Sequence, residues 1–381
     1  VSGIIVNTWT RWSSQMVRQL FPMLSLPLAD LTPDAVCQIK LHWRTEKRLA
    51  EHIATTRGRP TVEQAINDWL HVITDFAAIE SDFEGLISPN LMEQARRWLE
   101  QQNRDIGSIL EKEPEAQASL DQEDYALLLR AYQLRVGPLR KKGRVMSYSH
   151  IAIDEVQDFS PIEILILMDI CDDAKSFTLA GDTRQHISKE AGFSSWSSFL
   201  NQVGLESSSL HTLDISYRST HPITRFAVQL LEDNEEPLPT TLRDGPSVEL
   251  FQFSEHGACL IFISEELQKL QMNEPFANVA ILTPNADISQ MYAAGLQDSD
   301  VHKVRLVQNQ KFAFAPGIDV VEIDQVKGLE FDYVIVVEVS AFCYPDTPHN
   351  RRLLHVGATR AVHQLWLTSC ATISPIIKEI L

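Results

Sequence analysis

The sequence has few cysteines and no long apolar run, and both absences limit the class of protein. Its five cysteines are scattered and include no CxxC pair. An odd, unspaced set argues for a reducing compartment and against a disulfide framework or a zinc site. No uninterrupted apolar stretch approaches the roughly 20 residues that cross a bilayer, and no charged-then-apolar leader opens the chain. We therefore expect a cytoplasmic protein.

Positive charge is also scarce. The chain has 33 lysines and arginines against 51 aspartates and glutamates, which gives a formal net charge of −18. Such a chain repels a polyanion at long range, so any path for nucleic acid must be local. The densest basic cluster spans residues 135–144. It is either a solvated loop or a phosphate contact.

Length and composition are those of a multi-domain globular protein. The chain has 381 residues, of which 44% are hydrophobic and 22% charged, enough for two or three domains with their own cores. Apolar residues at three- and four-residue spacing predict helices over 60–79 and 90–102, and a polar turn over 7–12 precedes a helix from residue 15. Short apolar runs predict buried strands over 279–282, 320–323, 333–337 and 364–367.

Two acidic residues follow another apolar run, at residues 151–153. Asp154 and Glu155 stand where this strand ends, and open α/β sheets bind ligands beyond the carboxyl ends of their strands. Adjacent carboxylates are costly to keep ionised unless a cation compensates them. They therefore predict Mg²⁺ held by Asp154 and Glu155, with a water polarised by Glu155. The alternative is a solvated acidic turn.

Three more motifs follow in a fixed order: SYRST at 216–220, VKGLEFD at 326–332 and VGATRA at 356–361. With DEVQD at 154–158 and the segment around Gln185, they make the sequence similar to the UvrD/Rep class of superfamily 1 helicases. The stretches DEVQDFSP at 154–161 and LDQEDYALLL at 120–129 resemble the helicase IV or HelD-like branch. The resemblance covers nearly the whole chain, to about Trp366.

The resemblance implies a role for each matching residue at an ATP site. Gln185 matches the glutamine that contacts the γ-phosphate, Arg218 an arginine that reaches the same phosphate, and Arg360 a second arginine finger. Guanidinium suits this task because it stays charged and meets phosphate oxygens in a bidentate fork. Tyr217 is similar to the residue that stacks on adenine. Gly328 permits a tight turn beside the nucleotide, and Glu330 resembles the carboxylate that meets the ribose.

The same resemblance implies contacts with single-stranded DNA. Trp9, in the segment that ends at Thr10, matches an aromatic that supports bases, and Trp196 is a second candidate. Base stacking on an aromatic is worth roughly 1–3 kcal/mol and tolerates any sequence. The alternative for either tryptophan is a place in the core. Residues 188–191 read SKEA instead of the family's aromatic, arginine and glycine run, so the DNA path departs from the pattern more than the ATP site does.

The implied fold is α/β, with two RecA-like lobes of the P-loop NTPase type built on parallel sheets. Residues 1–31 and 145–210 correspond to an incomplete first lobe, 32–144 to a helical insertion in it, and 211–381 to the second lobe. Only about 110 residues separate Tyr217 from Lys327, so the large insertion of longer relatives is absent or vestigial. No GxxxxGK[ST] string, the P-loop that grips the phosphates, occurs in the chain. We expect an amino-terminally truncated fragment or a naturally shortened protein, inactive alone.

The expected activity of an intact parent is an ATP-dependent DNA helicase or translocase, with ATP and Mg²⁺ as cofactors and single-stranded DNA as partner. An alternative is a non-motor factor of HelD-like type that binds RNA polymerase or another protein. A degenerate remnant is the third possibility. Strong, salt-dependent binding of single strands favours the motor over the factor.

Overall fold

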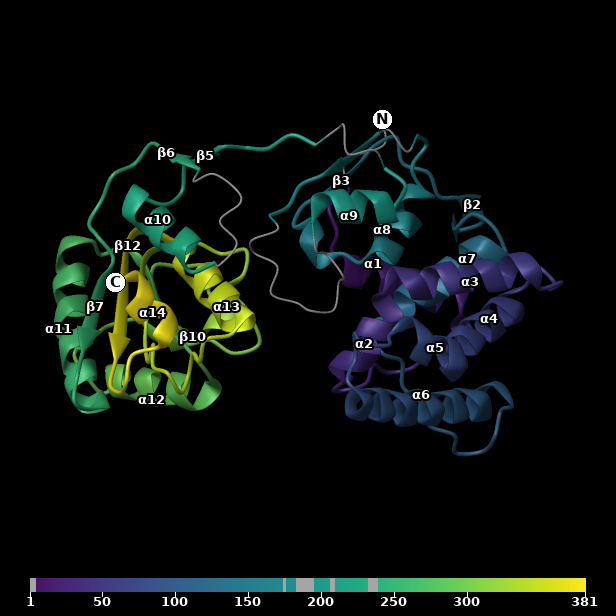
Figure 1. The fold of residues 1–381 in the computed structure, drawn as a ribbon, viewed down its shortest axis with the longest axis horizontal. Helices are drawn as coiled ribbons and strands as arrows, with labels where there is room; N and C mark the ends of the chain where they lie inside the picture. The colour runs from purple at the N-terminus through teal and green to yellow at the C-terminus, as the bar shows by residue number, and fades with distance from the viewer. Residues whose placement is uncertain (1–4, 174–175, 183–194, 206–209, 232–238) are drawn as a thin grey trace. The chain divides into compact units, whose positions relative to one another are not determined.

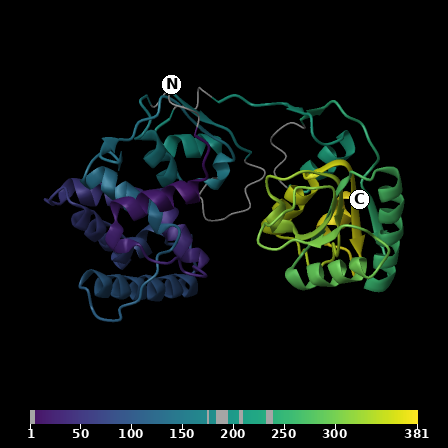
Figure 2. The same ribbon diagram turned by 180° about the vertical axis from the view of Figure 1, so that it is seen from behind.

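The computed structural model describes residues 5–173, 176–182, 195–205, 210–231 and 239–381. The chain forms two compact units, residues 1–210 and residues 211–381. Figures 1 and 2 show both units from opposite sides. Because each unit has its own hydrophobic core, we describe them one at a time.

Unit 1 is mainly helical. Its largest core is built from the apolar faces of the helices and includes Trp69, which is fully buried at the centre of α4. Amphipathic spacing explains this packing, since each helix buries one stripe and exposes the other. The helices are α1 (Trp9–Leu20), α2 (Asp34–Leu41), α3 (Trp43–Thr55), α4 (Val62–Thr74), α5 (Phe76–Asp82), α6 (Pro89–Leu110) and α7 (Asp124–Arg135), with a 3-10 turn, η1, at Pro22–Leu24.

Local capping changes two of the sequence expectations. The expected polar turn over 7–12 is wrong, because α1 already begins at Trp9, where the Thr8 hydroxyl accepts a hydrogen bond from the Arg11 amide at 3.3 Å. The single helix expected over 60–79 is two. Asp75 leaves the helical conformation (φ −77°, ψ 75°) and its carboxylate caps α5 by accepting from the Ala78 amide at 3.3 Å.

The rest of unit 1 carries a small parallel sheet and a second core. Strand β3 (Ile151–Ile153) pairs in parallel with β4 (Phe177–Leu179), and α8 (Pro161–Met168) connects them. Helices α8 and α9 (Trp196–Gln202) pack on these strands around Ile153, Val156 and Phe199. A basic hairpin formed by β1 (Arg140–Lys141) and β2 (Arg144–Val145) precedes β3, and a 3-10 turn, η2 (Val156–Asp158), follows it.

Unit 2 is a six-stranded, wholly parallel sheet in the order β7-β12-β11-β8-β10-β9. The four apolar runs coincide with β8 (Asn278–Thr283), β10 (Gly317–Glu322), β11 (Phe331–Val336) and β12 (Ala361–Ser369), except that Ile323 and Val337 lie just after the ends of β10 and β11. The central strands are buried on both faces, which explains why they read as continuous apolar runs. The edge strands are β7 (Glu249–Gln252) and β9 (Val304–Leu306), and a separate parallel pair is formed by β5 (Ile215–Ser216) and β6 (Thr240–Thr241).

Helices cover both faces of this sheet. One face packs on α11 (His256–Asn273) and α12 (Ala286–Gln297), and the other on α10 (His221–Gln229) and α13 (Pro348–Ala358). Helix α14 (Pro375–Ile380) ends the chain, and a 3-10 turn, η5 (Ile323–Val326), precedes β11. The predicted α/β class with parallel sheets is confirmed. Among the described residues, no helix is both long and apolar enough to span a membrane.

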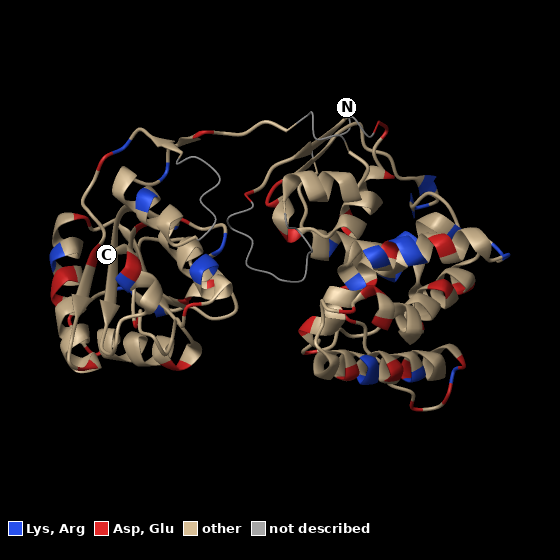
Figure 3. Ribbon diagram, viewed as in Figure 1, with Lys and Arg blue, Asp and Glu red and all other residues tan. Residues whose placement is uncertain are grey.

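Charged residues of both signs are interspersed over the helices in Figure 3. On α6, for example, Arg97 pairs with Glu93 at 2.9 Å, and Arg96 pairs with Glu100 at 3.1 Å. Exposed pairs of this kind contribute little to stability, but they neutralise part of the local charge. The acidic balance of the whole chain therefore does not exclude a local basic surface.

Candidate active site

The predicted acidic pair lies at the carboxyl end of β3. Asp154 is exposed and Glu155 half-buried, and the Glu155 amide donates to Asp154 Oδ1 at 3.0 Å. Glu155 has φ 52° and ψ 43°, in the left-handed region that costs a residue with a side chain on the order of 1–3 kcal/mol. Such strain turns the Glu155 carboxylate out of the strand direction. Oxygen ligands at a partly solvated strand end fit Mg²⁺, which keeps several of its waters.

Gln157 holds this turn in place, and sequence reasoning gave it no role. The side chain is fully buried, its amide donates to Glu155 Oε2, and its carbonyl accepts from the Asp182 amide at 3.0 Å. A Cβ on Gly181 would stand 2.4 Å from Gln157 Oε1. Glycine is thus favoured where the segment after β4 passes the glutamine, because a Cβ there would displace the Gln157 side chain. The two strand ends are joined through one side chain.

The motif continues into a capping box on α8. The Ser160 hydroxyl accepts from the Glu163 amide at 3.3 Å, and Glu163 Oε2 accepts from the Ser160 amide at 2.7 Å. Burial raises the pKa of Glu163 to about 7, although the hydrogen bonds to Ser160 act in the opposite direction by stabilising the carboxylate. The serine and proline of the DEVQDFSP stretch therefore end the acidic turn and start the helix. Gln185, the predicted γ-phosphate contact, lies outside the described residues.

In unit 2, the predicted nucleotide residues of two motifs meet. Tyr217 follows β5 with 67% of its surface exposed, and Arg218 Nε lies 3.0 Å from Glu330 Oε2. Glu330 lies in the loop between η5 and β11, where Gly328 has φ 78°. No Cβ contact would arise at Gly328, so the backbone angle, and not crowding, is what favours glycine there. Both members of the Arg218–Glu330 pair are well exposed, so the pair costs little to open.

The third motif joins the same edge of unit 2 but is buried. Arg360 is only 1% exposed, and its guanidinium donates to the carbonyl oxygens of Val356 and Leu329 at 3.1 Å and to Thr359 Oγ1 at 3.1 Å. Ser219 ties the first motif to the third, because its hydroxyl donates to the Ala361 carbonyl at 2.7 Å. Here Arg360 braces the loop that carries Glu330.

This edge of unit 2 is formed by the amino ends of β11 and β12. Phe331 opens β11 and Ala361 opens β12, and the Phe331 amide donates to the Arg360 carbonyl at 2.9 Å. In unit 1 the acidic pair lies at the carboxyl end of its strand. The rule that ligands bind at carboxyl ends therefore locates the residues of unit 1 but not those of unit 2.

The predicted DNA-contacting residues lie on unit 1. The Trp9 ring is half-buried, 5.4 Å from the ring of Trp12 and 6.2 Å from that of Phe159, just after the acidic turn. Thr10 is exposed and its hydroxyl accepts from Gln122 at 3.0 Å. Trp196 opens α9 and is partly buried against the second core. Both tryptophans combine core packing with partial exposure.

Comparison with known proteins agrees with this arrangement. The family model described as the UvrD/REP helicase N-terminal domain matches residues 16–189, and the model of the UvrD-like helicase C-terminal domain matches residues 317–368. No curated protein matches the chain. The first match contains Asp154 and Glu155, and the second contains Glu330 and Arg360.

Solved structures of helicases are similar to parts of the chain. The C-terminal domain of a possible DNA helicase from Lactobacillus plantarum WCFS1 shares 26% identity, over 44% of this chain and 94% of that one, with a TM-score of 0.37. The PRRSV helicase shares 16% identity, over 58% of this chain and 35% of its own, with a TM-score of 0.32. With a helicase N-terminal domain matched in unit 1 and a helicase C-terminal domain in unit 2, the chain belongs to the UvrD/Rep-type superfamily 1 helicases.

Proposed function

We propose that this helicase core hydrolyses ATP and uses the reaction to move on single-stranded DNA. The observation that supports this most strongly is the gathering of three separate motifs on one edge of unit 2, through the Arg218–Glu330 pair, the Arg360–Leu329 bond and the Ser219–Ala361 bond. Segments more than 100 residues apart are held together there by side chains whose types suit a nucleotide.

On unit 1, the chain's own residues would orient and deprotonate the attacking water. Glu155 is the general base, and Gln157 fixes its carboxylate by donating to Oε2. Asp154 and Glu155 would hold Mg²⁺, which supplies charge neutralisation for the phosphates when it is bound. The left-handed backbone at Glu155 sets the direction in which its carboxylate leaves the turn.

On unit 2, Tyr217 and Glu330 would bind the adenosine and Arg218 the phosphates. The exposed ring of Tyr217 offers a stacking face for adenine. Separating Glu330 from Arg218 costs about 1 kcal/mol or less. Arg218 can therefore exchange Glu330 for a phosphate, and Glu330 can exchange Arg218 for the ribose. Lys327 stands one residue before Gly328 and adds positive charge to the same loop.

Single-stranded DNA would bind unit 1 at Trp9, Thr10 and Trp196. Bases stack on tryptophan without regard to sequence, as a translocating enzyme requires. The exposed basic residues of the β1–β2 hairpin supply phosphate contacts on the same unit. Local contacts of this kind are what an otherwise acidic protein needs to hold a polyanion.

The test is ATP hydrolysis stimulated by single-stranded DNA. Because the 381 residues contain no P-loop string, we would measure the chain beside an extended form that carries a GKT or GKS loop before residue 1. The chain alone should turn over ATP far below a typical enzymatic rate of about 1 s⁻¹, and the extended form should be active and stimulated by an oligonucleotide. An extended form that hydrolyses ATP without any response to DNA would contradict the motor and favour a protein-binding factor.

A further inference from the structure

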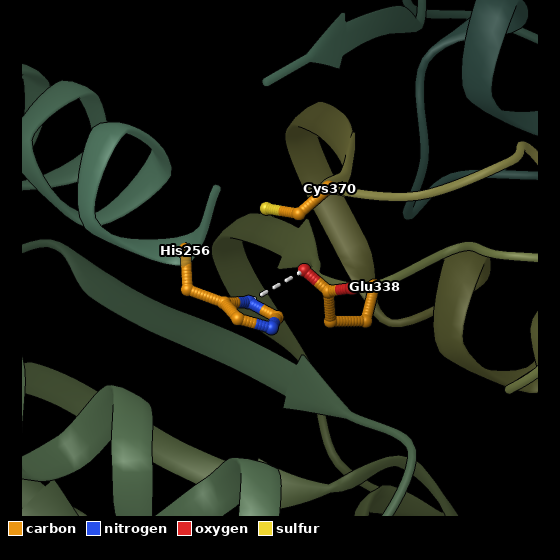
Figure 4. A group of neighbouring side chains, drawn as sticks. All are labelled: His256, Glu338 and Cys370. Carbon is orange, nitrogen blue, oxygen red and sulfur yellow. Dashed lines mark ion pairs between the residues drawn. The ribbon is translucent and has the colours of Figure 1, made fainter. Parts of the chain in front are cut away.

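A second cluster of chemically active side chains lies at the carboxyl ends of the unit 2 strands, opposite the amino ends where the helicase motifs meet. His256 opens α11 just after β7, Glu338 follows β11, and Cys370 follows β12. The three strands are neighbours in the order β7-β12-β11, so their carboxyl ends present the three side chains to one point. Figure 4 shows the sulfur, the carboxylate and the imidazole converging from three separate elements. None of them belongs to the helicase motifs.

The distances are those of a ligand set. One ligand atom from each residue lies within 4.8 Å of the other two, and His256 Nδ1 lies 3.1 Å from Glu338 Oε1. This distance is that of an ion pair, but the contact does not have the geometry of a hydrogen bond. The His256 Nδ1 atom is therefore buried with no hydrogen-bond partner among the described residues. Tetrahedral zinc with bonds of 2.0–2.3 Å separates its ligand atoms by about 3.3–3.8 Å, so even the widest separation has to close by little more than about 1 Å.

The electrostatics of the cluster leave a place for a cation. Glu338 is only 4% exposed and has φ 55°, so the backbone is strained to keep its carboxylate inside. Its ion-pair partner among the described residues is His256, and the Tyr292 hydroxyl donates to Oε1 at 3.2 Å. The buried Glu338 carboxylate is thus paired, among the described residues, with an imidazole that carries a charge only when protonated, so a bound cation would neutralise it.

We propose that His256, Glu338 and Cys370 bind a Zn²⁺ ion. Imidazole, carboxylate and thiolate together suit zinc, whereas Mg²⁺ and Ca²⁺ take oxygen ligands. One thiolate and one carboxylate neutralise both charges of the ion, and binding releases the thiol proton to solvent. His256 is the exposed member, with 42% of its side chain open to solvent, so the fourth position can hold water.

A hydrolytic triad is the other use of these residue types, and the arrangement disfavours it. A nucleophilic cysteine needs the histidine as its base, with the carboxylate behind the histidine. Here the carboxylate stands between the two, paired with His256 on one side and next to the thiol on the other.

Zinc at this point would join three elements of unit 2. The ion would add a direct link between the start of α11 and the ends of β11 and β12, beside the Tyr292 hydroxyl, which already bonds to Cys259 and Glu338. The sequence argued against zinc because no CxxC pair is present. The ligands come from positions 256, 338 and 370, so strand order, and not spacing along the chain, brings them together.

The test uses the purified 381-residue chain, stripped with a chelator and titrated with Zn²⁺ and then with Co²⁺. We expect one equivalent of Zn²⁺, a rise in the melting temperature, and, with Co²⁺, the tetrahedral d–d bands and thiolate-to-cobalt absorption. Cys370→Ser should abolish the thiolate band and weaken zinc binding by at least 10-fold, in line with the loss of a ligand. His256→Ala should weaken binding similarly.

Matched controls are Cys343→Ser and His349→Ala, which lie outside the cluster in the same unit and should bind as the unaltered chain does. Circular dichroism checks that each variant is folded. The proposal fails if the unaltered chain binds no zinc, or if folded Cys370→Ser keeps the thiolate band. Cys259 lies next to Cys370, so the proposal also fails if mass spectrometry of the freshly purified, metal-free chain shows a stable disulfide between the two.

Discussion

At the residue scale, the acidic turn depends on a buried amide. Gln157 bonds to Glu155 on one side and to the Asp182 amide on the other. We expect Gln157→Leu to lower the free energy of unfolding by about 1–3 kcal/mol, since two polar groups lose their partner. In the extended form it should reduce kcat on the order of 10²-fold, because the base is misplaced.

Gln133→Leu serves as the control for this variant. Its amide also donates to a backbone carbonyl, that of Ile166 at 3.0 Å, but it touches no predicted site residue. Thermal melts and steady-state ATPase assays should show a loss of stability in both variants and a loss of kcat in Gln157→Leu alone. Equal kcat values would remove Gln157 from the positioning of Glu155.

Glu163 should make stability depend on pH. Burial raises its pKa from 4.5 to about 7, so between these pH values the folded protein holds a proton that the unfolded chain has released. This carboxyl therefore lowers the free energy of unfolding as pH rises through that window, by up to roughly 3 kcal/mol. Glu163→Gln keeps the capping box and removes the titration.

The measurement is the melting temperature of Glu163→Gln relative to the unaltered chain, at pH 5 and at pH 8. The difference should grow in favour of the variant as pH rises. Glu84→Gln, at an exposed position in the same unit, should show no such trend. A constant difference across this range would mean that Glu163 is ionised throughout.

Arg360 has two possible roles that different measurements separate. Both a phosphate contact and a brace for the Leu329 carbonyl predict slower ATP hydrolysis in Arg360→Ala. Only the brace predicts a loss of stability, about 3 kcal/mol, because the guanidinium is 1% exposed and bonded to two backbone carbonyls. Thermal unfolding of Arg360→Ala should show that loss. An unchanged melting temperature with a lower kcat would assign the residue to the nucleotide alone.

At the element scale, the β1–β2 hairpin is the best candidate for a phosphate contact. Lys142 and Gly143 form its two-residue turn, both with positive φ, and the side chains of Arg140 through Arg144 are exposed. Arg135, in the same basic stretch of sequence, is instead held by Asp68 at 2.6 Å. Of the basic stretch at residues 135–144, the structure therefore leaves the hairpin residues as the candidates for phosphate contact.

Removing two charges from the hairpin should weaken the binding of single-stranded DNA. The variant carries both Lys141→Gln and Lys142→Asn. Asparagine tolerates the left-handed backbone at position 142, so the turn is kept. The slope of log affinity against log salt should fall by about 0.7 for each lysine that neutralised a phosphate. Lys47→Gln with Lys112→Asn is the control, because Lys112 also has a positive φ, of 59°. Fluorescence anisotropy at several salt concentrations measures these slopes. Identical slopes for the two double variants would show that the hairpin does not contact the phosphates.

At the scale of the whole molecule, the sequence was sufficient for some features and not for others. The four apolar runs of unit 2 could be predicted as strands because most of their residues are buried in the centre of the sheet, whereas β7 and β9 were missed because they are edge strands with no fully buried residue. The break between α4 and α5 depends on one capping carboxylate inside an otherwise helical pattern. The His256, Glu338 and Cys370 cluster depends on strand order, which no local pattern encodes.

The family and the fold class could be predicted from motif order, while the roles of single residues stay predictions. Resemblance named Arg218, Glu330 and Arg360, and the structure brings these residues to one edge of unit 2. It could not indicate that Arg360 is buried or that Gln157 links two strand ends, because both depend on side-chain packing. The HelD-like branch and the truncated amino end likewise stay predictions.

The central claim is that Glu155 of unit 1 and Arg218 of unit 2 are each required for ATP hydrolysis. The most direct test is to measure kcat for ATP hydrolysis by three versions of the extended form. These are the unaltered protein, the Glu155→Gln variant in unit 1 and the Arg218→Ala variant in unit 2. Arg352→Ala, an exposed arginine on α13, is the control for unit 2. We expect each of the first two variants to lose about 10³-fold or more in kcat, with nucleotide affinity changed much less, and the control to match the unaltered protein. A normal kcat in either Glu155→Gln or Arg218→Ala would contradict the claim.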